Sequence, residues 1–131
     1  ARLESLTKFY GVSLVVSEQA LQHLSNAEQF QMRFLDRVIV KGRSEAIAIY
    51  EILDGELEEI RNLKLQTLAD FESGLEHYRY GDCAQAKEYF QKVVAVNSSD
   101  KAAALYLERV EELQQKGIPE GWCGVWAMTK K

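Results

Sequence analysis

The sequence predicts a mixed α+β segment followed by an all-α segment. Within the first 52 residues, short apolar runs with strand-like alternation stand between helical patterns. From residue 56 onward, apolar residues recur at intervals of three and four, which is the spacing of one helix face. The turn-forming pair Asp54-Gly55 separates the two patterns. We therefore predict a first domain over residues 1–53, a helical region over 54–117 and a tryptophan-containing tail over 118–131.

The first segment is predicted to begin with a helix and to end with a hairpin. Gly11 ends a helical pattern over residues 2–10. A short apolar strand follows over residues 12–16, and Ser17 suits the N-cap of a helix that reaches about residue 24. After a polar loop come the parts of an antiparallel hairpin: a strand over residues 30–40, a Gly-containing turn over 41–45 and a strand over 46–52.

The second segment contains three predicted helices. The spacing of its apolar residues predicts one helix over residues 56–80, a second over 84–96 and a third over 101–116. Gly117 ends the third helix, and Pro119 prevents its continuation. The apolar residues of the second helix are expected to face inward; they are Ala86, Tyr89, Phe90, Val93 and Val94.

Part of this helical region has the pattern of a known repeat. The pattern consists of small and aromatic positions and two turns, namely Gly74, Tyr78, Gly81-Asp82, Ala86, Phe90 and Asn97. Residues 67–100 thereby resemble a single tetratricopeptide repeat, whose period is 34 residues. The resemblance implies two closely packed antiparallel helices with the third helix as a cap. Asp70, Ser73 and Ser98 depart from the family's preferred residues, and a plain helical hairpin would have nearly the same geometry.

Composition excludes several classes of protein. The 131 residues are 47% hydrophobic and 27% charged, a balance typical of a globular chain and not of a disordered one. The net charge is −4 and no basic stripe is present, so we expect no nucleic-acid partner. The longest apolar runs are far shorter than the roughly 18 residues that a membrane-spanning helix needs. With two cysteines there is no disulfide framework, and we expect a cytoplasmic location.

A few other side chains are candidates for a functional or a structural role. Cys83, near a helix start, is expected to be an inert thiol, although such a position can also lower a thiol pKa. Trp122 and Trp126 are expected to pack within the chain, with docking on a partner as the alternative. Asp36 and Arg37 are interpreted as a surface or cross-strand ion pair. The two histidines, His23 and His77, have no partners at metal-ligand spacing.

The first segment also carries a series of short motifs in a fixed order. They are Ala1-Arg2-Leu3-Glu4, Tyr10-Gly11-Val12, Val15-Val16-Ser17-Glu18, Phe34-Leu35-Asp36-Arg37-Val38, Val40-Lys41-Gly42-Arg43 and Ile49-Tyr50-Glu51. Their order and spacing resemble the C-terminal third of a class III nucleotide cyclase catalytic domain. Together with the acidic helical region, they resemble the ends of cyanobacterial adenylate cyclases. The resemblance implies that residues 1–53 are the end of a ferredoxin-like domain that includes the β-hairpin.

The resemblance also implies a chemistry. These enzymes cyclise ATP or GTP to the 3′,5′-cyclic nucleotide and release pyrophosphate, using two Mg²⁺ or Mn²⁺ ions held by two aspartates. By the resemblance, Arg2 matches the family's arginine that stabilises the transition state, a role in which a guanidinium suits phosphoryl oxygens. Lys41 matches the lysine that contacts the β and γ phosphates, and Arg43 stands where a second phosphate-binding lysine often occurs. The sites of such enzymes lie between two catalytic domains, so a homodimer is implied.

The sequence begins at Ala1 without an initiator methionine, so we expect it to be a piece of a larger protein that upstream segments could anchor to a membrane. The metal-binding aspartates would precede Ala1, so no metal ligand is expected in this chain, and the chain alone is expected to be inactive. ATP and GTP remain open as substrates. The alternative function is a tetratricopeptide-like module that binds a protein partner and is attached to a catalytically inactive cyclase remnant.

Overall fold

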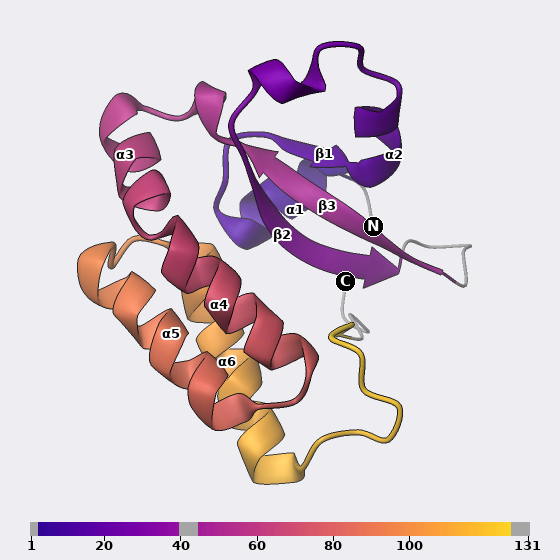
Figure 1. The fold of residues 1–131 in the computed structure, drawn as a ribbon, viewed down its shortest axis with the longest axis vertical. Coiled ribbons are helices and arrows are strands. Elements are labelled where there is room, and N and C mark those ends of the chain that lie inside the picture. The colour runs from indigo at the N-terminus through magenta and orange to yellow at the C-terminus, as the bar shows by residue number, and fades with distance from the viewer. Residues whose placement is uncertain (1–2, 40–44, 127–131) are drawn as a thin grey trace. The chain divides into compact units, whose positions relative to one another are not determined.

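The computed structural model describes residues 3–39 and 45–126, and Figure 1 shows the course of the chain. By its internal contacts the chain divides into two compact units. The first unit comprises Ala1–Arg61 with Val125–Lys131, and the second comprises Asn62–Gly124. The fold is therefore mixed α+β, with a small antiparallel sheet in the first unit and packed helices in the second.

The first unit is built around three antiparallel strands in the order β1-β3-β2. The predicted hairpin is confirmed, because β2 pairs with β3. Strand β3 is the central strand, since β1 pairs with its other edge. The elements in chain order are α1 (Leu3–Tyr10), β1 (Val15–Ser17), α2 (Glu18–Gln22), η1 (Ala27–Gln29), β2 (Met32–Ile39), β3 (Ala46–Ile52) and η2 (Leu53–Gly55).

The end of α1 explains why the first strand is shorter than predicted. Gly11 has a φ of 67°, a left-handed conformation that glycine adopts without steric penalty. The backbone N–H of Val12 donates to the carbonyl of Thr7 at 3.0 Å, and that of Gly11 donates to the carbonyl of Lys8 at 3.3 Å. This pair of bonds is a Schellman motif, so Val12 still belongs to the helix end. The strand begins at Val15 instead of the expected residue 12.

Ser17 forms the N-cap that the sequence predicts. Its hydroxyl accepts a hydrogen bond from the backbone N–H of Ala20 at 3.1 Å. The helix α2 ends at Gln22, close to the expected end at residue 24. The following polar segment contains one turn of 3-10 helix, η1, where a plain loop was expected.

The pairing of β2 with β3 contains an irregularity that the sequence did not predict. Phe34 lies opposite Tyr50, yet Asp36 lies opposite the next residue along, Ile49. Leu35 is therefore an extra residue in β2, a β-bulge, and its side chain is fully buried. A bulge increases the local twist of a strand and changes the direction of the side chains beyond it. The bulge therefore changes the direction of the residues at the end of β2 relative to those at its beginning.

The helix predicted over residues 56–80 is wrong in one respect, because it is two helices. They are α3 (Glu58–Gln66), which crosses the division between the units, and α4 (Leu68–Arg79). Thr67 separates them with a φ of −98° and a ψ of 7°. Its hydroxyl donates to the carbonyl of Leu63 at 2.9 Å. A threonine that bonds back onto the preceding turn commonly bends a helix.

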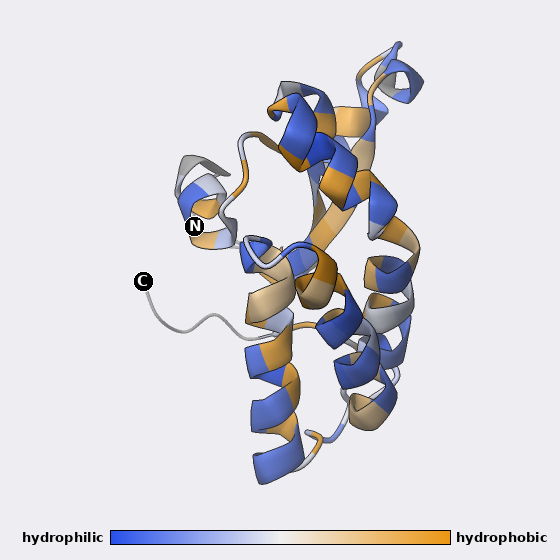
Figure 2. Cartoon of the chain, turned by 90° about the vertical axis from the view of Figure 1, so that its left-hand side faces the viewer, coloured by the Kyte–Doolittle hydropathy of each residue, from blue (hydrophilic) through white to orange (hydrophobic). Residues whose placement is uncertain are grey.

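The other helices of the second unit end close to where the sequence predicts. They are α5 (Cys83–Val96) and α6 (Lys101–Lys116). Asp82 caps α5 by accepting from the N–H of Gln85, and Asp100 caps α6 by accepting from that of Ala103, each at 3.3 Å. Along these helices Figure 2 shows hydrophilic and apolar residues alternating, as expected for helices that bury one face.

The core of the second unit is aromatic. The ring of Phe90 stacks on Tyr106 with 5.1 Å between centroids, and Phe71 meets Phe90 edge-on at 5.7 Å. Gly74 of α4 lies directly against the Phe90 ring, which allows α4 and α5 to approach closely. The residues of α5 that were expected to face inward divide into two groups: Ala86, Phe90 and Val93 are buried, whereas Tyr89 and Val94 are half-buried.

Part of the C-terminal tail packs on the same unit. The indole N–H of Trp122 donates to the backbone carbonyl of Tyr78 at 2.8 Å. The two rings also meet edge-on, with centroids 5.2 Å apart. For Trp122 the expectation of packing within the chain is confirmed. The same carbonyl, at the C-terminal end of α4, also accepts from the backbone N–H of Gly81 at 3.1 Å, so Trp122 adds a second donor there.

Candidate functional site

The residues that the sequence nominates for catalysis and phosphate binding are Arg2, Lys41 and Arg43, and all three lie outside the described residues. The structure describes the elements beside them. Helix α1 begins one residue after Arg2. Lys41 and Arg43 belong to the connection between β2 and β3, whose ends are fixed by the pairing of Ile39 with Ala46.

A buried hydrogen bond joins α1 to β2. The hydroxyl of Tyr10, the last residue of α1, donates to Oδ2 of Asp36. Tyr10 is 0% exposed and Asp36 is 1% exposed. Of the two interpretations of Asp36 and Arg37, a surface or a cross-strand ion pair, the surface one is wrong, since Asp36 is buried. The guanidinium of Arg37 lies over the Phe34 ring, 5.5 Å from its centroid.

The same carboxylate stabilises the backbone beside the bulge. Oδ1 of Asp36 accepts a hydrogen bond from the backbone N–H of Arg37 at 2.8 Å. Asp36 directly follows Leu35, the extra residue of β2. One carboxylate therefore contacts both the end of α1 and the strand at the point where its direction changes.

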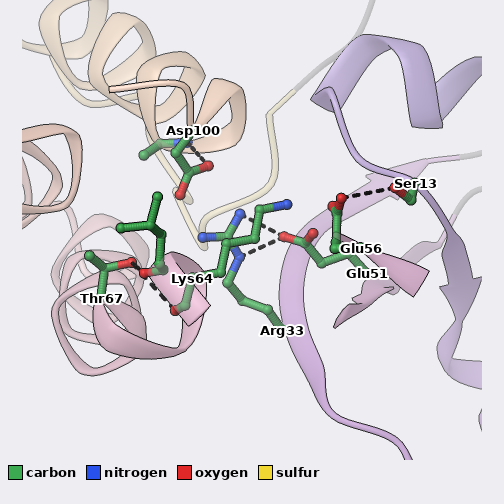
Figure 3. A network of polar contacts seen from close by, with 9 residues as sticks. Ser13, Arg33, Glu51, Glu56, Lys64, Thr67 and Asp100 are labelled. Atoms are coloured by element: carbon green, nitrogen blue, oxygen red, sulfur yellow. Dashed lines mark hydrogen bonds and ion pairs between the residues drawn. The ribbon is translucent and has the colours of Figure 1, made fainter. Parts of the chain in front are cut away.

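A second buried polar contact crosses the hairpin, between Arg33 of β2 and Glu51 of β3 (Figure 3). Both the Nη2 and the Nε atoms of Arg33 lie 2.6 Å from Oε2 of Glu51. The two residues are opposite each other in the sheet, and both side chains are buried. The local sequence pattern does not predict this ion pair.

Two further hydrogen bonds stabilise the end of β3 and the turn after it. The backbone N–H of Gln31 donates to Oδ1 of Asp54 at 2.7 Å. The hydroxyl of Ser13 donates to Oε1 of Glu56 at 2.9 Å, a contact also drawn in Figure 3. The Asp54-Gly55 turn predicted from the sequence is thus attached to the segments that precede β1 and β2.

The described residues offer no alternative metal centre. They contain no group of three or more His, Cys, Asp or Glu side chains arranged to hold a metal ion. Nδ1 of His77 lies 3.3 Å from Oδ2 of Asp82, and the imidazole stacks on the Tyr89 ring. The described residues therefore do not by themselves form a site for the metal ions that the cyclase resemblance implies.

Cys83 is not an activated thiol. Burial raises its pKa above the ordinary value of 9.0, and the negative charge of Asp82 raises the pKa further. At neutral pH the side chain is therefore the protonated thiol, which is a poor nucleophile. The expectation of an inert Cys83 agrees with this direction of the pKa shift.

Comparison with known proteins finds two relatives, both adenylate cyclases by name. An "Adenylate cyclase" from Anabaena cylindrica is 43% identical over 53 residues, which are 40% of this chain and 11% of that protein. An "Adenylate cyclase, terminal-differentiation specific" from Dictyostelium discoideum is 33% identical over 110 residues, 83% of this chain and 5% of that protein. The chain thus spans a small part of the length of each relative. No family model and no solved structure matches it.

These similarities show that the chain contains a region related to adenylate cyclases. The match to the Dictyostelium protein extends beyond the first unit of this chain. The reason is that residues 1–61 and 125–131, which form that unit, together number fewer than the 110 residues matched. It must therefore include residues of the helical unit. Within the described part of the chain, no helix has the length and apolar character needed to cross a membrane.

Proposed function

We propose that this chain is the C-terminal part of a class III adenylate cyclase, which converts ATP to 3′,5′-cyclic AMP and pyrophosphate. The observation that carries the proposal is the 43% identity over 53 residues to a protein named adenylate cyclase. The ordered motifs of the first 51 residues and the antiparallel hairpin support it. Residues 1–53 are then the end of a ferredoxin-like catalytic domain, of which α1 and the three-stranded sheet are the described part.

In this reaction the ribose 3′-oxygen forms a bond to the α-phosphorus, the bond from that phosphorus to the pyrophosphate oxygen breaks, and the 3′-hydroxyl proton is released. Negative charge grows on the transferring phosphoryl oxygens and on the departing pyrophosphate. The guanidinium of Arg2 stabilises this charge, because its planar array of N–H donors matches phosphoryl oxygens. Such a contact is strongest in the transition state and therefore raises turnover.

Lys41 has a different role in the proposed site. Its ammonium group binds the β and γ phosphates of ATP, and Arg43 adds a second positive charge nearby. Both residues belong to the connection between β2 and β3, and a hairpin connection is a suitable place for groups that must meet a ligand. The Mg²⁺ or Mn²⁺ ions of the reaction would be bound by aspartates that precede Ala1, and would activate the 3′-hydroxyl and bind phosphates.

The helical unit is proposed to be a tetratricopeptide-like tail of the cyclase that regulates or stabilises a homodimer. The similarity to the Dictyostelium cyclase supports this association, since it includes residues of that unit. The close approach of α4 and α5 at Gly74 supports the repeat-like packing. The competing function is an interaction module for a protein partner, with a catalytically inactive cyclase region.

Two substitutions in the full-length protein test the proposal. Arg2→Ala should lower kcat by at least about a hundredfold and leave KM for ATP within about threefold, since it removes a contact made in the transition state. Lys41→Ala should raise KM as well as lower kcat, since it removes a contact that the bound substrate already makes. Turnover unchanged by Arg2→Ala would refute the proposed site and favour the interaction module.

A further inference from the structure

The buried hydrogen bond between Tyr10 and Asp36 lies between the two elements that lead to the proposed phosphate-binding residues. Tyr10 ends α1, the helix that begins directly after Arg2. Asp36 belongs to β2, the strand that leads to Lys41. We infer that Tyr10 and Asp36 are positioning residues, which orient α1 on β2 so that Arg2 is correctly placed for catalysis. The inference rests on the proposed function and adds two residues to its site.

The hydrogen bond is suited to fixing an orientation. Among the α1 side chains whose exposure is described, Leu6 and Tyr10 are the buried ones. The apolar contacts of Leu6 are non-directional, whereas a hydrogen bond to a carboxylate is short and directional. In a site this well shielded from water the bond is also stronger than on the surface. Tyr10 therefore determines how α1 is turned on the sheet.

Asp36 links the orientation of α1 to the strand β2. Its carboxylate accepts from the Tyr10 hydroxyl through Oδ2 and from the backbone N–H of Arg37 through Oδ1. The bulge at Leu35 lies immediately before it, and a bulge sets the direction of the residues that follow. The hydrogen bond thus joins α1 to β2 immediately after the bulge, where the direction of the strand changes.

The length of α1 makes the position of its first residue sensitive to Tyr10. The helix has eight residues, and at 1.5 Å per residue it is about 12 Å long. A rotation of about 5° at the Tyr10 end therefore moves the other end by about 1 Å. A displacement of about 1 Å in a catalytic group can reduce a rate by up to about a hundredfold. Loss of the Tyr10 hydroxyl is expected to lower turnover by about tenfold, within this limit.

The experiment measures cyclic AMP formation by the full-length protein and three of its variants: Tyr10→Phe, Arg2→Lys and the double variant. Tyr10→Phe should lower kcat about tenfold and change KM for ATP by less than about twofold. In the Arg2→Lys background the same change should alter kcat by less than about twofold, because Tyr10 acts through Arg2. Tyr50→Phe, which also removes a hydroxyl from the first unit and keeps the ring that meets Phe34, is the matched control and should be neutral.

Asp36→Asn changes the acceptor of the same hydrogen bond. It therefore tests the inference even if the Tyr10→Phe variant fails to fold. Its amide oxygen can accept from the Arg37 N–H while its amide N–H donates to the hydroxyl oxygen of Tyr10, so a contact with Tyr10 remains and at least about half of the turnover should be kept. Three results would overturn the inference: normal turnover in Tyr10→Phe, equal losses in both Arg2 backgrounds, or a loss in Asp36→Asn as large as in Tyr10→Phe. If instead the unmodified protein makes no product, or Arg2→Lys has unchanged turnover, the proposed function itself is refuted.

Discussion

Replacing Gly74 by alanine should destabilise the helical unit, although alanine is the better helix former. A Cβ atom at position 74 would lie 2.9 Å from both Cε1 and Cζ of Phe90 and 3.0 Å from Cδ1. Phe90 is 0% exposed, and its ring is held by Tyr106 and Phe71. The ring therefore has no free space into which it can move away from the added methyl group.

The magnitude follows from two opposing effects. Alanine in place of glycine within a helix stabilises by about 1 kcal/mol. Forcing an extra methyl group into a packed core destabilises by about 1–3 kcal/mol. With Phe90 confined, the second effect should exceed the first, for a net loss of about 1 kcal/mol in the free energy of unfolding. In a unit of roughly 60 residues this lowers the unfolding midpoint by about 4–8 °C.

Urea and thermal unfolding, followed by far-ultraviolet circular dichroism, measure the change in stability. Gly55→Ala is a suitable control, because a Cβ at Gly55 meets no atom within 4 Å. In a Phe90→Leu background, which lacks the ring atoms that clash, Gly74→Ala should become neutral or stabilising by up to about 1 kcal/mol. A Gly74→Ala variant more stable than the unmodified chain would refute the packing argument.

Three further predictions concern other contacts. Glu51→Gln removes the carboxylate charge that lies 2.6 Å from the buried Arg33 guanidinium and should lower the free energy of unfolding by about 3–5 kcal/mol in a urea titration; a loss below about 1 kcal/mol would contradict the role of the ion pair. Because the Cys83 pKa is raised in the folded chain, iodoacetamide at pH 8 should alkylate Cys83 more slowly than in the unfolded chain, and stability should fall as pH rises above about 9, since the unfolded chain loses that proton first; equal alkylation rates, followed by mass spectrometry, would count against the shift. Trp122→Phe removes the hydrogen bond to the Tyr78 carbonyl and should destabilise by about 0.5–1.5 kcal/mol in thermal unfolding, whereas an unchanged midpoint would show that the bond is not needed.

Much of the fold could be predicted because local signals determine it. Ser17, Asp82 and Asp100 cap helices, and Gly11 and Gly117 end them, at or near the predicted boundaries. Thr67 was a weaker signal, since threonine is tolerated within helices and the apolar spacing continues past it.

The buried polar contacts could not be predicted, because they depend on the bulge in β2. If the pairing of Ile39 with Ala46 is continued along the hairpin, Phe34 falls opposite Glu51. The extra residue, Leu35, instead brings Arg33 opposite Glu51. Nothing in the local sequence pattern fixes which residue of a strand is bulged out, so a cross-strand register deduced from the sequence fails at this point.

The proposed nucleotide-binding residues rest on the family resemblance and remain predictions. They are Arg2, Lys41 and Arg43, which lie outside the described residues. The hydrogen bond between Tyr10 and Asp36, from which we infer their positioning role, was not predicted, because the sequence favours a surface or cross-strand ion pair of Asp36 with Arg37. A local sequence pattern cannot reveal a contact between Tyr10 and Asp36, because the two residues are 26 positions apart and lie in different elements.

The most direct test of the account is cyclic nucleotide formation by the full-length protein, measured with ATP and with GTP in parallel assays that contain Mn²⁺. We predict cyclic AMP and pyrophosphate in equal amounts from ATP, and no product from ATP when residues 1–131 are assayed alone. Cyclic GMP from GTP, with no cyclic AMP from ATP, would contradict the assigned substrate. The absence of product from both nucleotides would contradict the central claim that the chain belongs to a working cyclase.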